Sequence, residues 1–317
     1  MFVNPLGFLL SFLIFPGMLF SFGVALLYVG IDRKVSARMQ NRIGPPVWQE
    51  FLDVFKLLGK EDITPRPAQS LLFSIAPLLA VGAVITVMML LPVYSSQPAF
   101  TMVADLIVIL YLLNIPAICM MLGGYSSGSP FGSVGAARHI IQLFGYELVF
   151  ILSVLTVAEE VGALRVEEIV SYQAGRGWLL FNWRLLPAAL ATIIAAQGKL
   201  LRIPFDIPEA ETEIVHGSLT EYSGPKLALF RVAYDVETLA VAALFSALFL
   251  GGPASWSVGW LRVPAIVDFL IKTLAVVLVT TLIRNIAARL RIDQALKFYW
   301  TFILLLALLS LGLVMLG

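Results

Sequence analysis

Eight apolar runs, each close to the length of one membrane crossing, dominate this chain of 317 residues. A helix needs about 20 apolar residues to cross the hydrocarbon core of a bilayer. The runs cover residues 6–31, 70–91, 104–122, 140–158, 185–197, 227–250, 264–282 and 298–316. We therefore predict an all-α membrane protein, a bundle of eight transmembrane helices that forms one domain over residues 1–317. The fifth run is the weakest, because Gln197 and Lys199 cut it short.

The low charge content supports a membrane protein. Only 13% of the residues are charged, whereas soluble domains have about 25%. The 21 basic and 20 acidic residues nearly cancel, so no nucleic-acid partner is indicated. We expect the first run to be a permanent span and not a cleaved signal peptide, since no basic residue precedes it and no small-residue cleavage site ends it. The bilayer is therefore the first predicted partner.

Few residues of this chain could hold a redox cofactor. Cys119 is the one cysteine, and the histidines are His139 and His216. This set excludes a disulfide framework, a cysteine-ligated zinc site and an iron–sulfur cluster built by this chain alone. We expect no cofactor and no metal in the chain, so any electron-carrying group belongs to a partner subunit.

Basic residues in the loops predict the orientation of the bundle. The odd-numbered connections carry 15 lysines and arginines, and the even-numbered ones carry 4. Because basic loops stay on the cytoplasmic side, we expect a multi-pass protein of the cell membrane with both termini outside. The regions around Gly44 and Gly217 should face the cytoplasm.

The first cytoplasmic loop, residues 32–69, carries a cluster of basic residues and a predicted helix. Within residues 48–60, apolar side chains recur at Phe51, Val54, Phe55 and Leu58, which is helical spacing. We predict a short amphipathic helix at the membrane interface, with a solvated connector as the alternative. The basic cluster precedes a rigid Gly-Pro-Pro turn at 44–46. It comprises Arg33, Lys34, Arg38 and Arg42.

The acidic cytoplasmic loop, residues 199–226, carries most of the loop carboxylates. Asp206 and Glu209 form a capping-box-like start, which predicts a short helix over about 207–216. Glu209 and Glu213 would then share one helix face at i, i+4, while Glu211 would point elsewhere. Like charges at that spacing repel, so a structural role alone does not account for them. A solvated acidic loop is the alternative.

Acidic residues also lie inside the spans or at their edges. A charge at membrane depth costs at least a few kcal/mol, so it usually faces water or a partner. Grouped, poorly solvated carboxylates exchange protons near neutral pH. Asp268 and Lys272 at i, i+4 are expected to neutralise each other, and Asp105 is expected at the membrane edge. The acids are Asp105, Glu147, Asp235, Glu237 and Asp268, with Arg231 and Lys272 as possible partners.

Three segments resemble one protein family. They are Asp32–Pro46 with the residues up to Glu61, Gly145–Glu147 in the fourth span, and Pro204–Gly217 followed by Glu221–Gly224. They are similar to the junction, or heel, membrane subunit of the superfamily that contains respiratory complex I and the membrane-bound nickel–iron hydrogenases. The resemblance covers all eight spans in order.

The resemblance implies a non-redox subunit that docks a hydrophilic electron-transfer arm and couples electron transfer to proton or sodium translocation. It implies iron–sulfur clusters, and for a hydrogenase a nickel–iron centre, in partner subunits, together with antiporter-like and small membrane subunits. The expected arm-docking residues are Arg33, Lys34, Arg38, Arg42 and Arg202. The expected ion-translocation residues are Glu147, Asp206, Glu209, Glu211, Glu213, Glu221, Asp235 and Glu237.

Three departures indicate a branch of the superfamily. Lys199 stands where complex I members usually have an acid, and Tyr234 stands where they have an acid near the start of span six, with Asp235 about 100° further around the helix. Residues 128–132, Gly-Ser-Pro-Phe-Gly, are more like the hydrogenase-type branch. We therefore favour a ferredoxin-driven hydrogen-evolving or sulfur-reducing complex.

Two other functions stay open. The first is the same position in a quinone-reducing NADH dehydrogenase. The second is a stand-alone secondary transporter, which is disfavoured because such transporters commonly show inverted repeats and broken helices that this sequence lacks.

Overall fold

The structure is a computed structural model that describes the backbone of residues 5–258 and 261–316, without the side chains of residues 5, 6, 8, 211, 212, 257, 258, 261 and 262. It confirms the all-α bundle. Apolar runs form helices in lipid because each backbone N–H and C=O must be hydrogen-bonded within its own segment. The α-helices are α1 Pro5–Leu13, α2 Met18–Met39, α3 Gln49–Leu58, α4 Ser70–Leu90, α5 Asp105–Leu112, α6 Ile115–Ser126, α7 Pro130–Val161, α8 Val166–Arg176, α9 Leu186–Lys199, α10 Glu211–Ile214, α11 Gly224–Phe249, α12 Ala265–Ile286, α13 Ile292–Phe298 and α14 Leu304–Met315.

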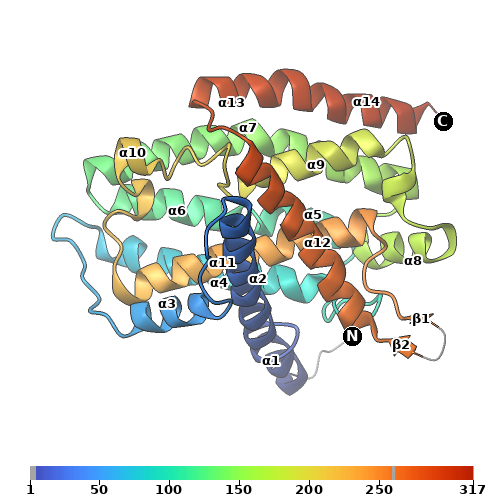
Figure 1. Cartoon of the computed structure of the whole chain (residues 1–317), viewed down its shortest axis with the longest axis horizontal. Helices are drawn as coiled ribbons and strands as arrows, with labels where there is room; N and C mark the ends of the chain where they lie inside the picture. The colour runs from blue at the N-terminus through green and yellow to red at the C-terminus, as the bar shows by residue number, and fades with distance from the viewer. Residues whose placement is uncertain (1–4, 259–260, 317) are drawn as a thin grey trace.

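Seven helical segments of the described chain are long and apolar enough to cross a membrane. The eighth expected span is α9, which has 14 residues and a length of about 21 Å. It lies beside α7 and α14 (Figure 1) and packs against both. The bundle therefore agrees approximately with the eight predicted spans, with a short α9.

Helix α11 forms the centre of the bundle. In its most apolar stretch 94% of the residues are buried, compared with 28% for the segment Ile292–Met315 at the edge. It packs against α2, α4 and α12 and also touches α3. Charged side chains on α11 are therefore enclosed by protein.

Helix α3 confirms the predicted amphipathic helix in the first loop. It buries Val54 and Glu50 and exposes Leu52 and Phe55. An exposed apolar face beside a membrane bundle is typical of a helix that lies in the interface. Its buried face contacts α2 and α11.

The far end of the bundle carries elements that the sequence does not predict. Helix α8 follows α7, and two antiparallel strands of three residues each, β1 Trp256–Val258 and β2 Leu261–Val263, precede α12. Beside them the predicted Asp268–Lys272 pair is confirmed, with 2.7 Å between Lys272 Nζ and Asp268 Oδ2. Asp105 is buried at the start of α5, where it accepts a hydrogen bond from the N–H of Met102.

The predicted helix over 207–216 is wrong. The acidic loop contains one helical turn, α10, and a 3₁₀ turn, Gly217–Leu219. The side chain of Asp206 is held by Arg289, 3.0 Å from Nε to Oδ1. Arg289 Nη2 also donates to the backbone carbonyl of Asp206. A side chain engaged in this way with the chain before α13 does not cap a helix. Glu209 and Glu213 consequently do not share a helix face.

Candidate functional site

A cavity of about 740 Å³ opens at the end of the bundle that carries loops 32–69 and 199–226, which we call the charged end. Its walls come from α2, the chain after α9, α11 and α12. Most of its polar lining is charged. The charged and polar residues that line it are Asp32, Arg33, Gln40, Arg202, Asp206, Glu209, His216, Arg231, Tyr234, Asp235, Thr238, Arg284 and Asn285.

Asp32, on α2, organises one wall of the cavity. Its carboxylate accepts a hydrogen bond from Thr281 Oγ1 at 2.5 Å and pairs with Arg284 Nη1 at 3.0 Å. Arg202 Nη2 lies 3.7 Å from the same carboxylate, and Arg202 Nη1 donates to Thr280 at 2.7 Å. Opposite charges at these distances favour the ionised form of a buried carboxylate. The wall is therefore a fixed array of charges.

Glu50 of α3 organises a second wall. It is completely buried and pairs with Arg33 at 2.8 Å and with Arg231 at 2.6 Å. Asp53 pairs with the same two arginines at 3.0 and 3.8 Å. Burial raises the pKa of Asp53, but the hydrogen bonds from Gln49 and Arg33 and the charge of Arg231 together lower it below its usual value. This network attaches the amphipathic helix to α2 and α11.

The acidic loop divides its carboxylates between the cavity and the outer surface. Asp206 and Glu209 line the cavity. Glu213 points outward and pairs with Arg138 of α7 at 2.5 Å, and this hydrogen bond and charge lower the pKa of Glu213. Glu221 is half-buried just before α11, and the side chain of Glu211 lies outside the described part of the structure.

A second polar centre lies inside the bundle, where α7 meets the end of α9. Lys199 Nζ lies 3.2 Å from Glu147 Oε2 and donates to Asn114 Oδ1 at 2.6 Å. Asn114 Nδ2 donates to Glu147 Oε1 at 2.7 Å. The three side chains therefore close a ring. The Lys199 ammonium also lies 5.3 Å from the ring centroids of Tyr146 and Phe150, which favour a cation.

Buried groups of α11 lie between the cavity and this ring. Glu237 lies within electrostatic range of Lys199 and Glu147. Tyr234, at the cavity wall, lies within range of Glu209, Glu237 and Tyr146. Within the described residues, the hydroxyls of Tyr146 and Tyr234 and Oε1 of Glu237 have no hydrogen-bond partner. Buried polar groups of this kind are usually satisfied by ordered water.

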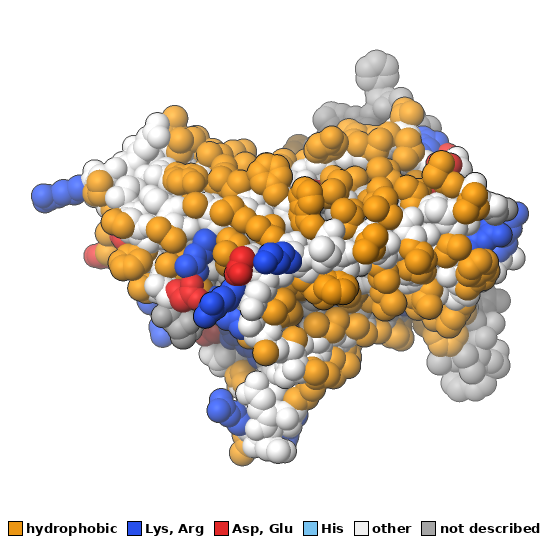
Figure 2. Space-filling view, turned by 90° about the horizontal axis from the view of Figure 1, so that it is seen from above, with side chains coloured by type: hydrophobic (Ala, Val, Ile, Leu, Met, Phe, Trp, Pro, Cys, Tyr) orange, Lys and Arg blue, Asp and Glu red, His pale blue; other side chains and the backbone are white. Residues whose placement is uncertain are grey.

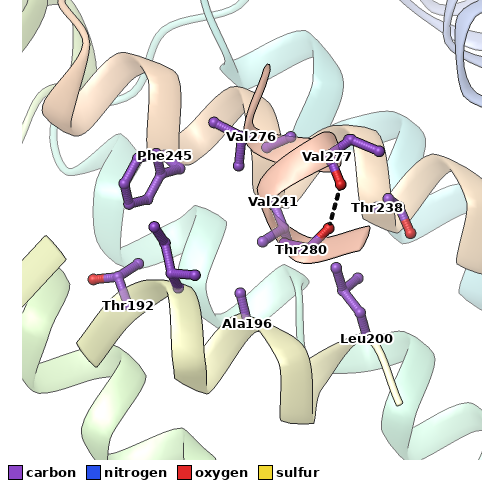
Figure 3. A pocket seen from close by; sticks show the side chains of 11 residues that line it. Thr192, Ala196, Leu200, Thr238, Val241, Phe245, Val276, Val277 and Thr280 are labelled. Carbon is purple, nitrogen blue, oxygen red and sulfur yellow. Dashed lines mark hydrogen bonds between the residues drawn. The ribbon is translucent and has the colours of Figure 1, made fainter. Parts of the chain in front are cut away.

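A small apolar cavity of about 10 Å³ lies between α9, α11 and α12 (Figure 3). It shares Leu200 and Thr238 with the large cavity. Figure 3 shows the hydroxyl of Thr280 turned to the carbonyl of Val277, at 2.8 Å. The volume suffices for about one water molecule. The large cavity is thus bordered on its inner side by tightly packed apolar side chains.

The predicted docking residues fall into two groups. Lys34, Arg38 and Arg42 are exposed, and within the described chain none of them has a carboxylate at ion-pair distance. Arg33 and Arg202 instead line the cavity and pair with internal acids. The exposed group alone has the placement of a protein-binding surface.

Sequence reasoning misses Asp32, Arg284 and Asn114 as members of these centres. In the sequence Asp32 stands at the start of a loop, and its partners follow it by about 250 residues in the chain. Lys199 departs from a family pattern, but its pairing with Glu147 is not expected from the sequence. The available signal is a charged residue at the end of an apolar run.

Within the described residues, no group of three or more His, Cys, Asp and Glu side chains lies close enough together to hold a metal ion. Cys119 is buried in α6. The chemistry of both centres is therefore that of carboxylates, basic groups and hydroxyls.

Comparisons with known proteins agree with this architecture. The sequence profile of the family described as NADH dehydrogenase matches residues 12–315. A membrane protein of Phocaeicola vulgatus, one of the subunits of its NADH-quinone oxidoreductase, is 34% identical over 305 residues, which cover 91% of this chain and 85% of that protein. A chain of an archaeal respiratory membrane complex, the membrane-bound sulfane sulfur reductase, superposes with a TM-score of 0.86 at 32% identity. The match covers 97% of this chain and 99% of that one.

Proposed function

Because the chain belongs to the NADH dehydrogenase family, we propose that it is the non-redox membrane subunit that docks a hydrophilic electron-transfer arm and couples electron transfer to ion translocation. It is a complex I-like, multi-pass subunit of a respiratory oxidoreductase complex. In the proposal, iron–sulfur clusters and, for a hydrogen-evolving complex, a nickel–iron centre belong to partner subunits. Antiporter-like and small membrane subunits complete the ion path.

One observation supports coupling most strongly: charged and hydroxyl side chains continue from the cavity into the centre of the bundle. Asp206 and Glu209 line the entrance. Tyr234 and Glu237 follow on α11, and the Lys199–Glu147 pair ends the series. Such groups are costly inside a membrane protein unless they have a function or a partner. A proton taken up at the cavity would pass along this series.

The Lys199–Glu147 pair is proposed as the switch of the path. When Glu147 takes up a proton, its attraction for the Lys199 ammonium disappears, and the remaining carboxylate in range is that of Glu237. The ammonium then shifts toward Glu237, and the shift favours release of the proton from Glu147 on its other side. Each protonation thus moves one positive charge within the bundle.

Docking is assigned to the exposed basic residues Lys34, Arg38 and Arg42 at the charged end. A basic surface next to the cavity favours an acidic face on the hydrophilic arm. In this orientation the charged end faces the cytoplasm and both termini face outside, as the basic loops predict.

The branch of the superfamily is also a proposal. The sequence 128–132 and Lys199 in place of an acid favour a ferredoxin-driven complex that evolves hydrogen or reduces sulfur compounds. The similarity to the sulfane sulfur reductase chain is consistent with this. The second candidate is the junction subunit of a quinone-reducing NADH dehydrogenase, which the cavity of about 740 Å³ and the 34% identical relative favour. Assay of the purified complex with each acceptor separates the two.

The experiment for coupling is ion uptake per electron in reconstituted vesicles, for both H⁺ and Na⁺. The test variant is Glu147→Gln/Lys199→Met. The matched control is Asp268→Asn/Lys272→Met, which removes another buried ion pair that lies away from the proposed path. We expect ion uptake to fall in the test variant and to stay normal in the control, with assembly checked in the same samples. Normal stoichiometry in both would remove the pair from the path.

A further inference from the structure

Two adjoining cavities lie between α7 and α13 on the outer face of the bundle, away from the proposed ion path. The first, of about 200 Å³, is polar and is lined by Arg138, Glu213, Arg289, Arg291 and Asp293 together with Ile207, Leu290 and Ile292. The second, of about 460 Å³, is an open groove lined by Ile141, Phe144, Leu296, Lys297, Trp300 and Thr301.

The two cavities follow one another along the same pair of helices. On α7, Arg138 lines the polar pocket, and Ile141 and Phe144 line the groove, at intervals of three residues. Residues three apart lie on the same helix face. On the opposite side, Asp293 borders the pocket and Leu296 and Trp300 border the groove. The polar pocket therefore continues into the apolar groove toward the centre of the membrane.

The charge of the pocket is net positive. Its lining has three arginines and two acids, and Lys297 adds one positive charge at the border with the groove. Glu213 engages Nη1 of Arg138, and Asp206 engages Arg289, so both guanidinium groups are held in place. A guanidinium has five N–H donors, so several remain for another anion. Arg291 and Lys297 have no carboxylate at ion-pair distance within the described residues.

The surface around the cavities is apolar. Figure 2 shows a compact group of basic and acidic side chains on a face that is otherwise mostly hydrophobic. Phe144 and Trp300 are exposed there at 65% and 54%. Basic pockets between transmembrane helices commonly hold anionic headgroups, and tryptophan is common at the membrane interface.

We propose that this pocket and groove form a binding site for one phospholipid with an anionic headgroup, whose phosphate lies among Arg138, Arg291 and Lys297 and whose hydrocarbon chain lies along Ile141, Phe144 and Trp300. The site takes a membrane lipid and not free phosphate, because the groove offers apolar surface that a free phosphate would leave empty. The lipid would hold the acidic loop, through the Arg138–Glu213 pair, against α7 and α13.

Trp300 provides the test, because brominated lipid chains quench tryptophan fluorescence on contact. The purified complex is reconstituted in phosphatidylcholine vesicles with a minor fraction of brominated phosphatidylglycerol or of brominated phosphatidylcholine. The chain has six tryptophans, so the signal of Trp300 is obtained by subtraction of a Trp300→Phe variant. We expect stronger quenching by the anionic lipid. A basic group beside an anionic headgroup changes the preference roughly fivefold, so Arg291→Gln and Lys297→Gln should each lower it by about that factor.

Lys60→Gln is the matched control, since Lys60 is an exposed lysine at the charged end that does not line either cavity. It should leave the preference unchanged. Equal quenching by both lipids would mean bulk lipid contact only and would overturn the site. Absence of quenching would mean that a protein subunit covers the groove, and would overturn it too. Should the charge variants fail to assemble, native mass spectrometry of the unmodified complex decides, because a specific site retains one anionic lipid after detergent washing. Addition of inorganic phosphate should not displace that lipid.

Discussion

Lys199 Nζ lies 3.2 Å from Glu147 Oε2, although the two side chains come from different helices and the lysine side chain is completely buried. Asn114 bridges the pair by donating to the carboxylate and accepting from the ammonium. The pair therefore has its hydrogen bonds arranged by the fold, which partly offsets the cost of taking both charges out of water.

This pairing leads to the first prediction, which concerns stability. Lys199→Met leaves the Glu147 carboxylate buried without its counter-charge, so we expect a loss of about 3–5 kcal/mol in the bundle. Glu147→Gln/Lys199→Met removes both charges and should lose less than Lys199→Met alone. Thermal unfolding of the purified complex measures both variants. A double variant at least as unstable as the single one would show that the two residues act independently.

The second prediction concerns the close packing that positions Lys199. A Cβ at Gly198 would overlap with the hydroxyl of Tyr299, whereas a Cβ at Gly82 would meet nothing within 4 Å. Gly198→Ala should therefore displace Tyr299 or the end of α9 and lower both stability and ion uptake. Overpacking of this kind costs about 1–3 kcal/mol. Gly82→Ala, inside α4, is the control and should be neutral or slightly stabilising. Equal behaviour of the two variants in a thermal melt would contradict the packing argument.

The third prediction concerns pH. The hydrogen bond and charge of Arg138 lower the pKa of Glu213. A lowered folded-state pKa means that the pair stabilises the protein above the unfolded pKa of about 4.3, and that this contribution disappears as the pH falls through the lowered value. Because Glu213 is 53% exposed, the contribution is small, below about 1 kcal/mol. The difference in thermal midpoint between wild type and Arg138→Gln should be present at neutral pH and shrink in acid. A difference that grows in acid would reverse the sign of the argument.

The fourth prediction concerns orientation. Ile43 is 92% exposed, which makes Ile43→Cys a suitable reporter for the charged end. Gly217 is unsuitable, because its φ is +54° and a Cβ there would overlap with the carbonyl oxygen of Pro208. We expect a membrane-impermeant thiol reagent to label Ile43→Cys only after the cytoplasmic side is made accessible, and to label Leu316→Cys in intact cells. The opposite pattern would invert the bundle. The native Cys119 is buried and should not react.

The fifth prediction concerns docking of the hydrophilic arm. Lys34, Arg38 and Arg42 are exposed at the charged end. Replacing all three by alanine should weaken retention of the arm during purification and raise its salt sensitivity, because exposed charges act through screened, long-range attraction. Lys60→Ala, in the same loop, is the control. Co-purification of the arm in equal yield from both variants would exclude this surface as the docking site.

The class of fold and its main divisions follow from the order of the amino acids alone. Long apolar runs have one solution in a bilayer, which is the helix, so the spans and the amphipathic helix α3 could be predicted from composition and periodicity. The local pair Asp268–Lys272 could be predicted for the same reason, since i, i+4 residues meet on any helix. The buried acids could be identified as exceptional, because charge is rare in such runs.

Which of these charges meet depends on the packing of the helices in three dimensions. Asp32 and Arg284, or Glu147 and Lys199, are distant in the chain, and their contact depends on how helices pack and rotate, which a single sequence does not encode as a local pattern. The acidic loop shows the same limit: Asp206 has the spacing of a helix cap, but Arg289 from before α13 binds its carboxylate, so Glu209 turns to the cavity and Glu213 to Arg138. Local propensity is worth about 1 kcal/mol at a cap, and a partly buried ion pair with backbone hydrogen bonds outweighs it.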